Sequence, residues 1–207
     1  AATAGATAAA SPAGSAALPA CVVRPEQTEG PFFVEEGLER SDIRSDPSSG
    51  AVSEGAPLSL TFNVSRVSGG SCAPLGGSIV DVWQCDALGV YSDVSGSSAR
   101  FLRGHQVTDA SGRAAFTTIY PGWYQGRAVH IHFKIRSGSE EFTSQLYFDD
   151  ALSDTVFGQA PYAQRGQRTT RNSADGLYRN GGDQLLLEVT PSGDGYAATF
   201  DIGLATG

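Results

Sequence analysis

The sequence predicts an all-β protein: an antiparallel or mixed β-sandwich with long loops and a few short helical turns. Eight short segments carry alternating or continuously apolar residues of strand length. The 207 residues include 26 glycines, and turn-forming residues separate the segments. About eight short strands at this spacing are typical of two sheets packed face to face.

The first two predicted strands are the clearest in this part of the chain. In residues 58–65, four apolar residues alternate with polar ones, which predicts a half-buried strand. Residues 79–85 form a more continuous apolar run and predict a more deeply buried strand. Asp86 and Gly89 follow directly and suit a tight turn.

The middle of the chain predicts a hairpin. Residues 101–108 and 113–120 both have strand composition and flank a short Asp-Ala-Ser-Gly stretch at residues 109–112. A turn of this kind between two strands is typical of antiparallel partners. We therefore expect these two strands to pair with each other.

The last part of the chain predicts four further strands and one irregular region. Residues 128–135 and 141–148 read as strands, and residues 184–189 and 196–202 as an antiparallel pair. Residues 149–182 have no clear period. We expect short helical turns and a long loop over the sheet in this region.

Length and composition predict one folded domain and exclude two classes of partner. Residues 21–207 are long enough for a single domain with a sizeable core, whereas residues 1–20 consist almost entirely of Ala, Gly, Ser, Thr and Pro and predict a disordered tail. We read this tail as the remainder of an exported, secreted protein. The net charge of −8 argues against nucleic-acid binding. No apolar run approaches the ~20 residues that a membrane helix needs.

The three cysteines leave two interpretations open. Cys72 and Cys85 bracket a short connection and one predicted strand, so a disulfide between them would stabilise the fold by about 3 kcal/mol. Cys21 would then be left free or paired outside the chain. The alternative is three buried free thiols. We favour the disulfide between Cys72 and Cys85.

A His-x-His pair on one strand face is the first functional signal. Along residues 128–135, four apolar residues occupy one face, and His130 and His132 lie on the other. Two imidazoles about 7 Å apart along a strand can converge on one metal ion. The alternative is a polar strand face that looks at solvent. Tyr124 and Arg127 lie just upstream and favour a functional cluster.

The motifs around this pair resemble a known family. The runs at residues 82–92, 101–104, 106–109 and 121–132 are together similar to the intradiol ring-cleavage dioxygenases. That family includes catechol 1,2-dioxygenases and protocatechuate 3,4-dioxygenases, and the likeness is closest to its small secreted branch. The resemblance covers residues 21–203. It implies cleavage of a catechol ring between its two hydroxylated carbons with O2, to give a muconate-type product.

The resemblance also implies a metal and its ligands. In the family, two tyrosinates and two histidines hold a non-haem ferric ion, and these positions fall on Tyr91, Tyr124, His130 and His132. A phenol has a pKa of about 10 and ionises at neutral pH only beside a strong Lewis acid. A hard trivalent ion suits anionic oxygen ligands. Tyr120 is a competitor for the role of Tyr124, but it precedes a proline.

Three further positions take their roles from the resemblance. Arg127 matches the active-site arginine and would stabilise negative charge that develops on the ring. Gln145 matches an active-site glutamine, and residues 28–31 match a motif near the substrate mouth. Tyr124 would be the ligand that the incoming catechol displaces, while Tyr91 stays bound. Tyr147 and Trp123 are candidates for pocket lining, and the third histidine, His105, is interpreted as structural.

Two other classes of function compete with this interpretation. The first is a non-catalytic β-sandwich module that binds carbohydrate or another surface. The second is a zinc or copper site at His130 and His132 completed by water. The sequence does not identify which catechol is the substrate, and we expect a monomer or a weak homo-oligomer.

Overall fold

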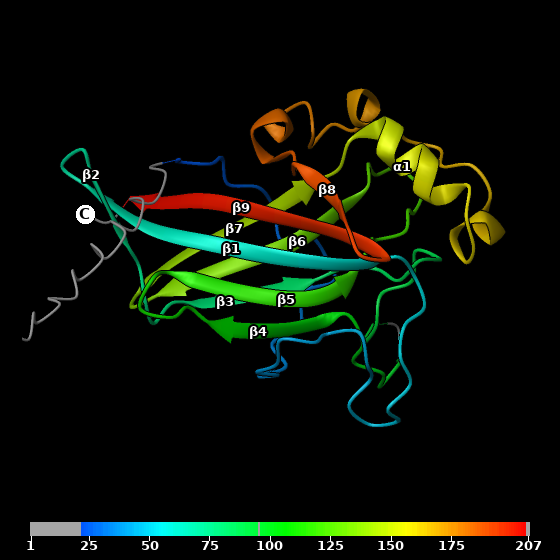
Figure 1. Ribbon diagram of the computed structural model, residues 1–207, viewed down its shortest axis with the longest axis horizontal. Helices are drawn as coiled ribbons and strands as arrows, with labels where there is room; N and C mark the ends of the chain where they lie inside the picture. The colour runs from blue at the N-terminus through cyan, green and yellow to red at the C-terminus, as the bar shows by residue number, and fades with distance from the viewer. Residues whose placement is uncertain (1–21, 95, 206–207) are drawn as a thin grey trace, which may run out of the picture.

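Nine strands form two sheets in the computed structural model, which describes residues 22–94 and 96–205 (Figure 1). The first sheet contains β1 (Pro57–Ser68), β2 (Ser71–Pro74), β5 (Arg113–Ile119), β8 (Val189–Ser192) and β9 (Gly195–Ala205). The second contains β3 (Ile79–Trp83), β4 (Arg103–Val107), β6 (His130–Ser137) and β7 (Glu140–Tyr147) in the order β4-β3-β6-β7. Strands β1 and β9 run parallel and the other pairs antiparallel. The predicted all-β, mixed-sheet fold is confirmed.

The core lies between the two sheets and follows from the alternation in their strands. In β1, Leu58, Leu60, Phe62 and Val64 are all buried, as the period of two requires. Phe62 faces Phe133 of the opposite sheet at a ring-centroid distance of 5.3 Å. It also contacts two phenylalanines of its own sheet, on β5 and β9, at centroid distances of 6.1 and 6.0 Å. Phe62 therefore joins the two layers.

We expect Phe62→Ala to destabilise the fold by about 3–5 kcal/mol, because the ring leaves a cavity between the two sheets that the surrounding strands fill only in part. Urea unfolding followed by tryptophan fluorescence measures this change. Val107→Ala on β4 is the control, since Val107 is 44% exposed and a surface truncation changes stability by about 0.5 kcal/mol or less. Equal losses for the two variants would contradict the role given to Phe62.

The predicted hairpin of residues 101–108 and 113–120 is wrong in its pairing. The turn is present, with the amide of Gly112 donating to the carbonyl of Asp109 at 2.9 Å. However, β4 pairs with β3 and β5 pairs with β1, so the turn carries the chain from one sheet to the other. A turn residue pattern does not distinguish a hairpin from a corner between two packed sheets.

The C-terminal antiparallel pair is confirmed, but its first strand is displaced along the chain. Residues 182–185 form the short 3-10 helix η3 (Gly182–Leu185) rather than strand, and β8 begins only at Val189. Strand β2 was not predicted. The helical turns expected in residues 149–182 are α1 (Asp150–Phe157), η1 (Tyr162–Arg165) and η2 (Asn172–Ala174), and they gather at one end of the sandwich (Figure 1). No helix of the described residues is long and apolar enough to span a membrane.

The predicted disulfide between Cys72 and Cys85 is wrong. Cys85 is a buried free thiol that follows β3 of the second sheet, whereas Cys72 lies on β2 of the first. Closeness along the chain did not translate into closeness in space because the two strands belong to different layers. The expectations for Cys21 and for the tail of residues 1–20 lie outside the described residues.

We expect Cys85 to resist alkylation in the folded protein. Burial raises the pKa of its thiol to about 12, and the carboxylate of Asp86 adds to the effect. At pH 8 the reactive thiolate is then roughly a thousandfold rarer than in a free cysteine. Iodoacetamide labelling with peptide mass mapping, in native buffer and in urea, measures this protection. Rapid labelling of Cys85 in native buffer would contradict it.

Candidate metal centre

Strand β6 places two imidazoles on the same face of the second sheet. The apolar residues Ile131, Phe133 and Ile135 point into the core and are fully buried. The period of two therefore turns His130 and His132 to the other face. This face is also buried, at 2% and 1% exposure for the two histidines. Part of the segment 22–56, which precedes β1, covers it.

The loop of residues 28–33 belongs to this covering segment and lies directly over the histidines. Gly30 adopts a positive φ of 68°, and a Cβ atom there would lie 3.3 Å from Cε1 of His132. The ring of Phe32 stacks on that of Tyr91 at a centroid distance of 4.3 Å. The carbonyl of Thr28 accepts a hydrogen bond from Nε2 of Gln145 at 3.0 Å. The loop that was expected near the substrate mouth is thus in contact with the candidate ligands.

Two phenols approach the same point from other segments. Tyr91 lies in the turn after β3, and Tyr124 lies between β5 and β6. The hydroxyl oxygens of Tyr124 and Tyr91 are 3.0 and 3.5 Å from Nε2 of His130. Nε2 of His132 is 3.1 Å from the same atom. The structure therefore brings together all four residues that the sequence predicted as ligands.

The hydrogen bonding of His130 shows that the four donors suit a cation. Its Nδ1 lies 2.6 Å from the carbonyl oxygen of Ala128, which can only accept a hydrogen bond. Nδ1 therefore carries the proton, and Nε2 offers a single lone pair to three neighbouring polar atoms. One lone pair cannot satisfy two phenols and a second imidazole. A metal ion at their centre would be bound by all four donor atoms.

The ring of His132 is fixed by stacking rather than by a hydrogen bond. It lies parallel to the indole of Trp83, with 6° between the planes and 5.0 Å between the centroids. Its Nδ1 is buried and has no hydrogen-bond partner among the described residues. No sequence pattern indicated that Trp83 supports a ligand, because an aromatic residue at the end of a buried strand is usually part of the core.

Burial determines the protonation of the four donors. It lowers the pKa of His130 to about 3, with a further contribution from the positive charge of Arg127. It also lowers the pKa of His132, with a contribution from His130. Burial raises the pKa of Tyr91 and of Tyr124. At neutral pH the protein alone thus holds neutral imidazoles, ready to bind metal, and neutral phenols that need a strongly charged cation to ionise.

The predicted Arg127 and Gln145 meet beside the four donors. Gln145 lies opposite His132 in the register of β6 and β7 and is fully buried. Its Oε1 accepts a hydrogen bond of 2.5 Å from Nη2 of Arg127. The same Nη2 lies 3.4 Å from the hydroxyl of Tyr147, so Tyr147 belongs to this cluster. Nε of Arg127 forms an ion pair of 2.9 Å with Asp175, which the sequence analysis missed.

The remaining candidates lie away from the centre. The hydroxyl of Tyr120 bonds to Ser153 at 2.8 Å and its ring packs on Phe148, so Tyr120 is a core residue and not the second phenolic ligand. Trp123 donates to the carbonyl of Gly166 and carries Arg165 over its ring, so it supports a loop and does not join the site. His105 lies on β4 opposite Asp81.

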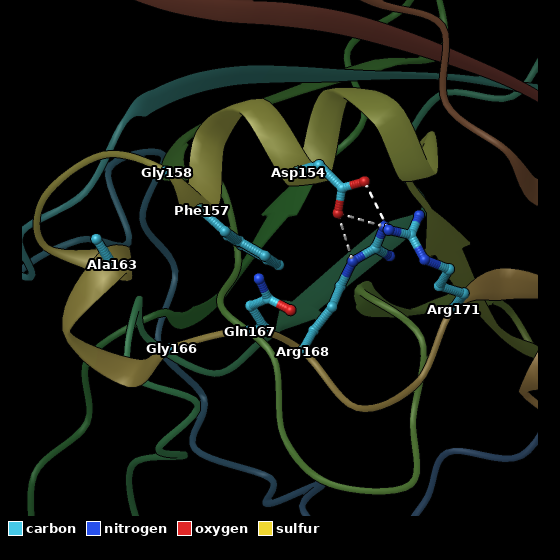
Figure 2. Close-up of a pocket in the computed structure, with 8 residues that line it drawn as sticks. All are labelled: Asp154, Phe157, Gly158, Ala163, Gly166, Gln167, Arg168 and Arg171. Carbon is cyan, nitrogen blue, oxygen red and sulfur yellow. Dashed lines mark hydrogen bonds and ion pairs between the residues drawn. The ribbon is translucent and has the colours of Figure 1, made fainter.

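The position of a cavity beside the centre indicates where a substrate can enter. An apolar cavity of about 360 Å³ adjoins the two tyrosines and is lined also by Phe32, Val90 and Phe101. A second, of about 430 Å³, lies between α1 and residues 163–171 (Figure 2) and is lined by none of the four donors. The first is the one in contact with the candidate metal centre.

Fold and site together define a class: a β-sandwich protein with a buried centre of two phenols and two imidazoles. The comparisons with known proteins identify the family. A family model described as "Dioxygenase" matches residues 28–204, and the chain belongs to the intradiol ring-cleavage dioxygenase family.

Solved structures of similar proteins cover almost the whole chain. An intradiol ring-cleavage dioxygenase from Tetranychus urticae is 32% identical with a TM-score of 0.81, over 89% of this chain and 95% of its own. The dioxygenase domain of a dioxygenase and carbohydrate-binding protein fusion from Streptomyces sp. SirexAA-E is 33% identical with a TM-score of 0.69, over 90% of this chain and 100% of its own.

Curated relatives match over a shorter stretch. The protocatechuate 3,4-dioxygenase beta chain of Burkholderia cepacia is 34% identical over 63% of this chain and 63% of its own length. Catechol 1,2-dioxygenase 2 of Acinetobacter lwoffii is 31% identical over 60% of this chain and 51% of its own length. The match thus spans less than two thirds of each of these relatives.

Proposed function

We propose that this protein is a non-haem Fe(III) intradiol dioxygenase. Tyr91, Tyr124, His130 and His132 would hold the iron. The reaction would add both atoms of O2 to a catechol and cleave the ring between the two hydroxylated carbons, which gives a cis,cis-muconate-type diacid. The observation that carries this proposal is the convergence of two phenol oxygens and two imidazole nitrogens on one point.

The iron would supply Lewis acidity that binds the two oxygens of the catechol and makes its ring reactive toward O2. The chain's own residues would prepare the substrate. Tyr124 is half-buried, whereas Tyr91 is only 5% exposed, so Tyr124 is the phenol that an incoming molecule reaches. Ionised beside the metal, its phenolate oxygen would take up one proton from the catechol and become a neutral phenol. Tyr91 would keep its place under the stacked ring of Phe32.

Arg127 would stabilise the negative charge that develops during ring cleavage. Its guanidinium is held beside the centre by Gln145 and Asp175. Burial lowers its pKa, but the charges of Asp175 and Tyr124 outweigh this effect, and the net shift of the Arg127 pKa is upward. The side chain thus remains a fixed positive charge throughout the working pH range, as electrostatic stabilisation of a reacting group requires.

The two rival functions are less well supported by the site. Zinc enzymes usually take three protein ligands from His, Cys, Asp and Glu, and the described residues contain no group of three such side chains placed to hold a metal. A binding module without catalysis gives no reason for two tyrosines to face two buried histidines.

Oxygen uptake by the iron-loaded protein tests the proposal. Catechol, protocatechuate and hydroxyquinol form a suitable panel, and the product of an active substrate should gain both atoms of labelled O2 in its mass spectrum. Failure of every catechol to consume O2, or a product opened outside the two hydroxylated carbons, would overturn it. The choice of substrate, a monomeric or weakly associated state, and secretion stay predictions.

A further inference from the structure

We infer that Asp175 is a positioning residue that holds both Arg127 and the backbone next to His130. This inference rests on the proposed function, since it concerns how the same centre is organised. Asp175 follows η2, in the region of residues 149–182 where the sequence shows no period. The side chain of Asp175 is 1% exposed, although a carboxylate in a loop is ordinarily exposed to solvent.

The first contact of Asp175 is with the guanidinium. Its Oδ2 accepts a hydrogen bond of 2.9 Å from Nε of Arg127. Its other side-chain partners in the described residues are uncharged groups, namely Gln145, Tyr147 and the phenol of Tyr124. Asp175 is therefore the one carboxylate that pairs with Arg127 in the described part of the chain. A charge-assisted bond of this kind restricts a guanidinium to one orientation.

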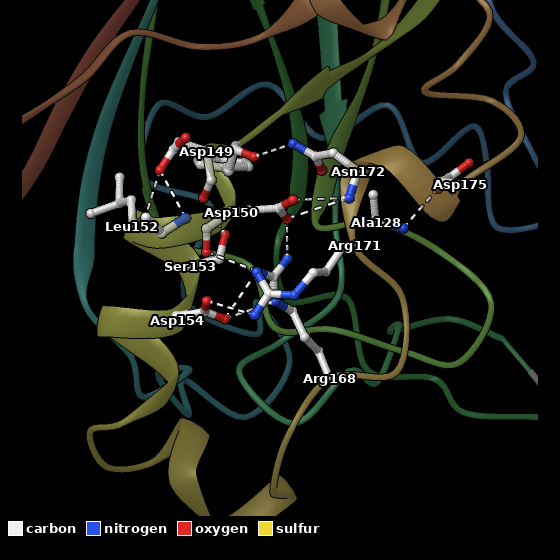
Figure 3. Close-up of polar contacts among 12 residues, drawn as sticks. Ala128, Asp149, Asp150, Leu152, Ser153, Asp154, Arg168, Arg171, Asn172 and Asp175 are labelled. Carbon is white, nitrogen blue, oxygen red and sulfur yellow. Dashed lines mark hydrogen bonds and ion pairs between the residues drawn. The ribbon is translucent and has the colours of Figure 1, made fainter.

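The second contact of Asp175 is with the segment that leads directly into β6, the strand that carries the histidines. The same Oδ2 accepts a hydrogen bond of 2.7 Å from the amide of Ala128, drawn in Figure 3. The carbonyl of Ala128 in turn accepts the Nδ1 proton of His130 at 2.6 Å. One oxygen atom thus holds the arginine and, through one residue, the imidazole whose Nε2 points at the metal centre. Partners that orient a ligand in this way affect both metal affinity and activity.

Asp175 is itself held from two sides. Its Oδ1 accepts hydrogen bonds from the amides of Leu177 and Tyr178, at 2.7 and 3.3 Å. Upstream, Nδ2 of Asn172 donates to the carbonyl of Phe148 at 2.9 Å, and the amide of Asn172 lies 3.3 Å from the carboxylate of Asp150 (Figure 3). These bonds tie η2 to the start of α1.

An arginine strengthens the same attachment. Arg168 is 4% exposed and forms ion pairs with both Asp150 and Asp154 of α1 (Figure 3). Asp154 also binds Arg171, at 2.8 Å. The loop from Arg168 to η2 is therefore attached to a helix, and the position of Asp175 does not depend on its own contacts alone. These contacts keep the carboxylate of Asp175 in a fixed position beside Arg127.

Asp175→Asn tests the inference in the iron-loaded enzyme. The substitution keeps the size of the side chain and removes the negative charge that pairs with Arg127. We expect kcat to fall about 10- to 100-fold, the size of a lost charge-assisted hydrogen bond. The amide oxygen of asparagine can still accept the hydrogen bond from Ala128, so bound iron and the KM for the catechol should change less than threefold. Asp183→Asn is the matched control, because Asp183 is an exposed acidic residue on η3 and should leave kcat unchanged.

A double-mutant cycle separates positioning from a general structural role. If Asp175 acts through Arg127, Asp175→Asn should have less than a threefold effect on kcat in the Arg127→Ala background. Asp175→Glu is the second variant, which keeps the charge but displaces it and should give an intermediate kcat. If Asp175→Asn does not fold, Asp175→Glu takes its place as the test variant.

The outcomes are distinguishable. If the wild-type protein is active and Asp175→Asn has the same kcat, the inference alone is overturned. If only Asp175→Glu folds, an unchanged kcat in that variant overturns it in the same way. If the fold-decreases in kcat of Asp175→Asn and Arg127→Ala multiply in the double mutant, the inference is also overturned. A wild-type protein that carries iron and turns over no catechol would overturn the proposed function, and the inference with it.

Discussion

We expect His130→Ala to abolish iron retention and the visible tyrosinate-to-iron absorption of the purified protein, and this is the largest effect that we expect. His130 is the residue whose Nε2 lies within 3.5 Å of both tyrosine hydroxyls and of His132. Loss of a partner that only orients a ligand lowers metal affinity roughly 10- to 100-fold, and loss of the ligand itself should exceed that. Elemental analysis after desalting and the visible spectrum measure the two quantities.

The matched control is His105→Ala. His105 is the third histidine of the chain and lies on β4, opposite Asp81 and away from the four donors. Its main chain keeps its hydrogen bonds to Leu38 and Arg40 when the ring is removed. His105→Ala should therefore retain iron and colour. Unchanged iron content in His130→Ala would refute the assigned ligand set.

The phenols give this experiment a second readout. Burial raises the pKa of both Tyr91 and Tyr124, so neither ionises at neutral pH in the protein without a cation. The colour therefore reports phenolates that exist only beside bound metal. A protein that contains iron but has no such absorption would hold the metal elsewhere, and the non-catalytic interpretation would then be favoured.

The sequence predicts those parts of the fold in which a strand carries its own apolar period. Residues 58–65 and 128–135 each have four apolar residues at alternate positions, and both lie in central strands whose apolar faces are buried. Partners are harder to predict. Strand β4 has one apolar side chain, Val107, and its neighbour could not be inferred from composition. Hence the predicted hairpin was in fact a corner between sheets.

The site shows the same division between local pattern and tertiary contact. His130 and His132 share a face by the geometry of one strand, and Tyr91 and Tyr124 were placed by resemblance to the family. Asp175 had no such signal, because a single aspartate after a 3-10 turn is ordinarily a solvent-exposed cap. Its role depends on where the loop after α1 meets the start of β6, which no local pattern specifies.

The second large effect that we expect is the loss of turnover in Arg127→Ala with the colour retained. Arg127 donates to Gln145 and Asp175 and also interacts with the hydroxyl of Tyr124, but it contributes no donor atom to the metal centre, so its removal leaves the four candidate ligands in place. Removal of one group that stabilises developing charge typically costs about 10²–10³ in kcat. Steady-state oxygen uptake and the visible spectrum of the same sample measure the two properties together.

Two variants show whether the effect belongs to the charge at this position. Arg113→Ala removes an exposed arginine on β5 and should leave both colour and kcat unchanged. Arg127→Lys keeps a positive charge but cannot reproduce the planar fork that bonds to Gln145 and Asp175 together, so kcat should recover only in part. If Arg127→Ala turned over substrate at the wild-type rate, charge stabilisation would have to come from another group. Asp175 could then not act on kcat by positioning Arg127.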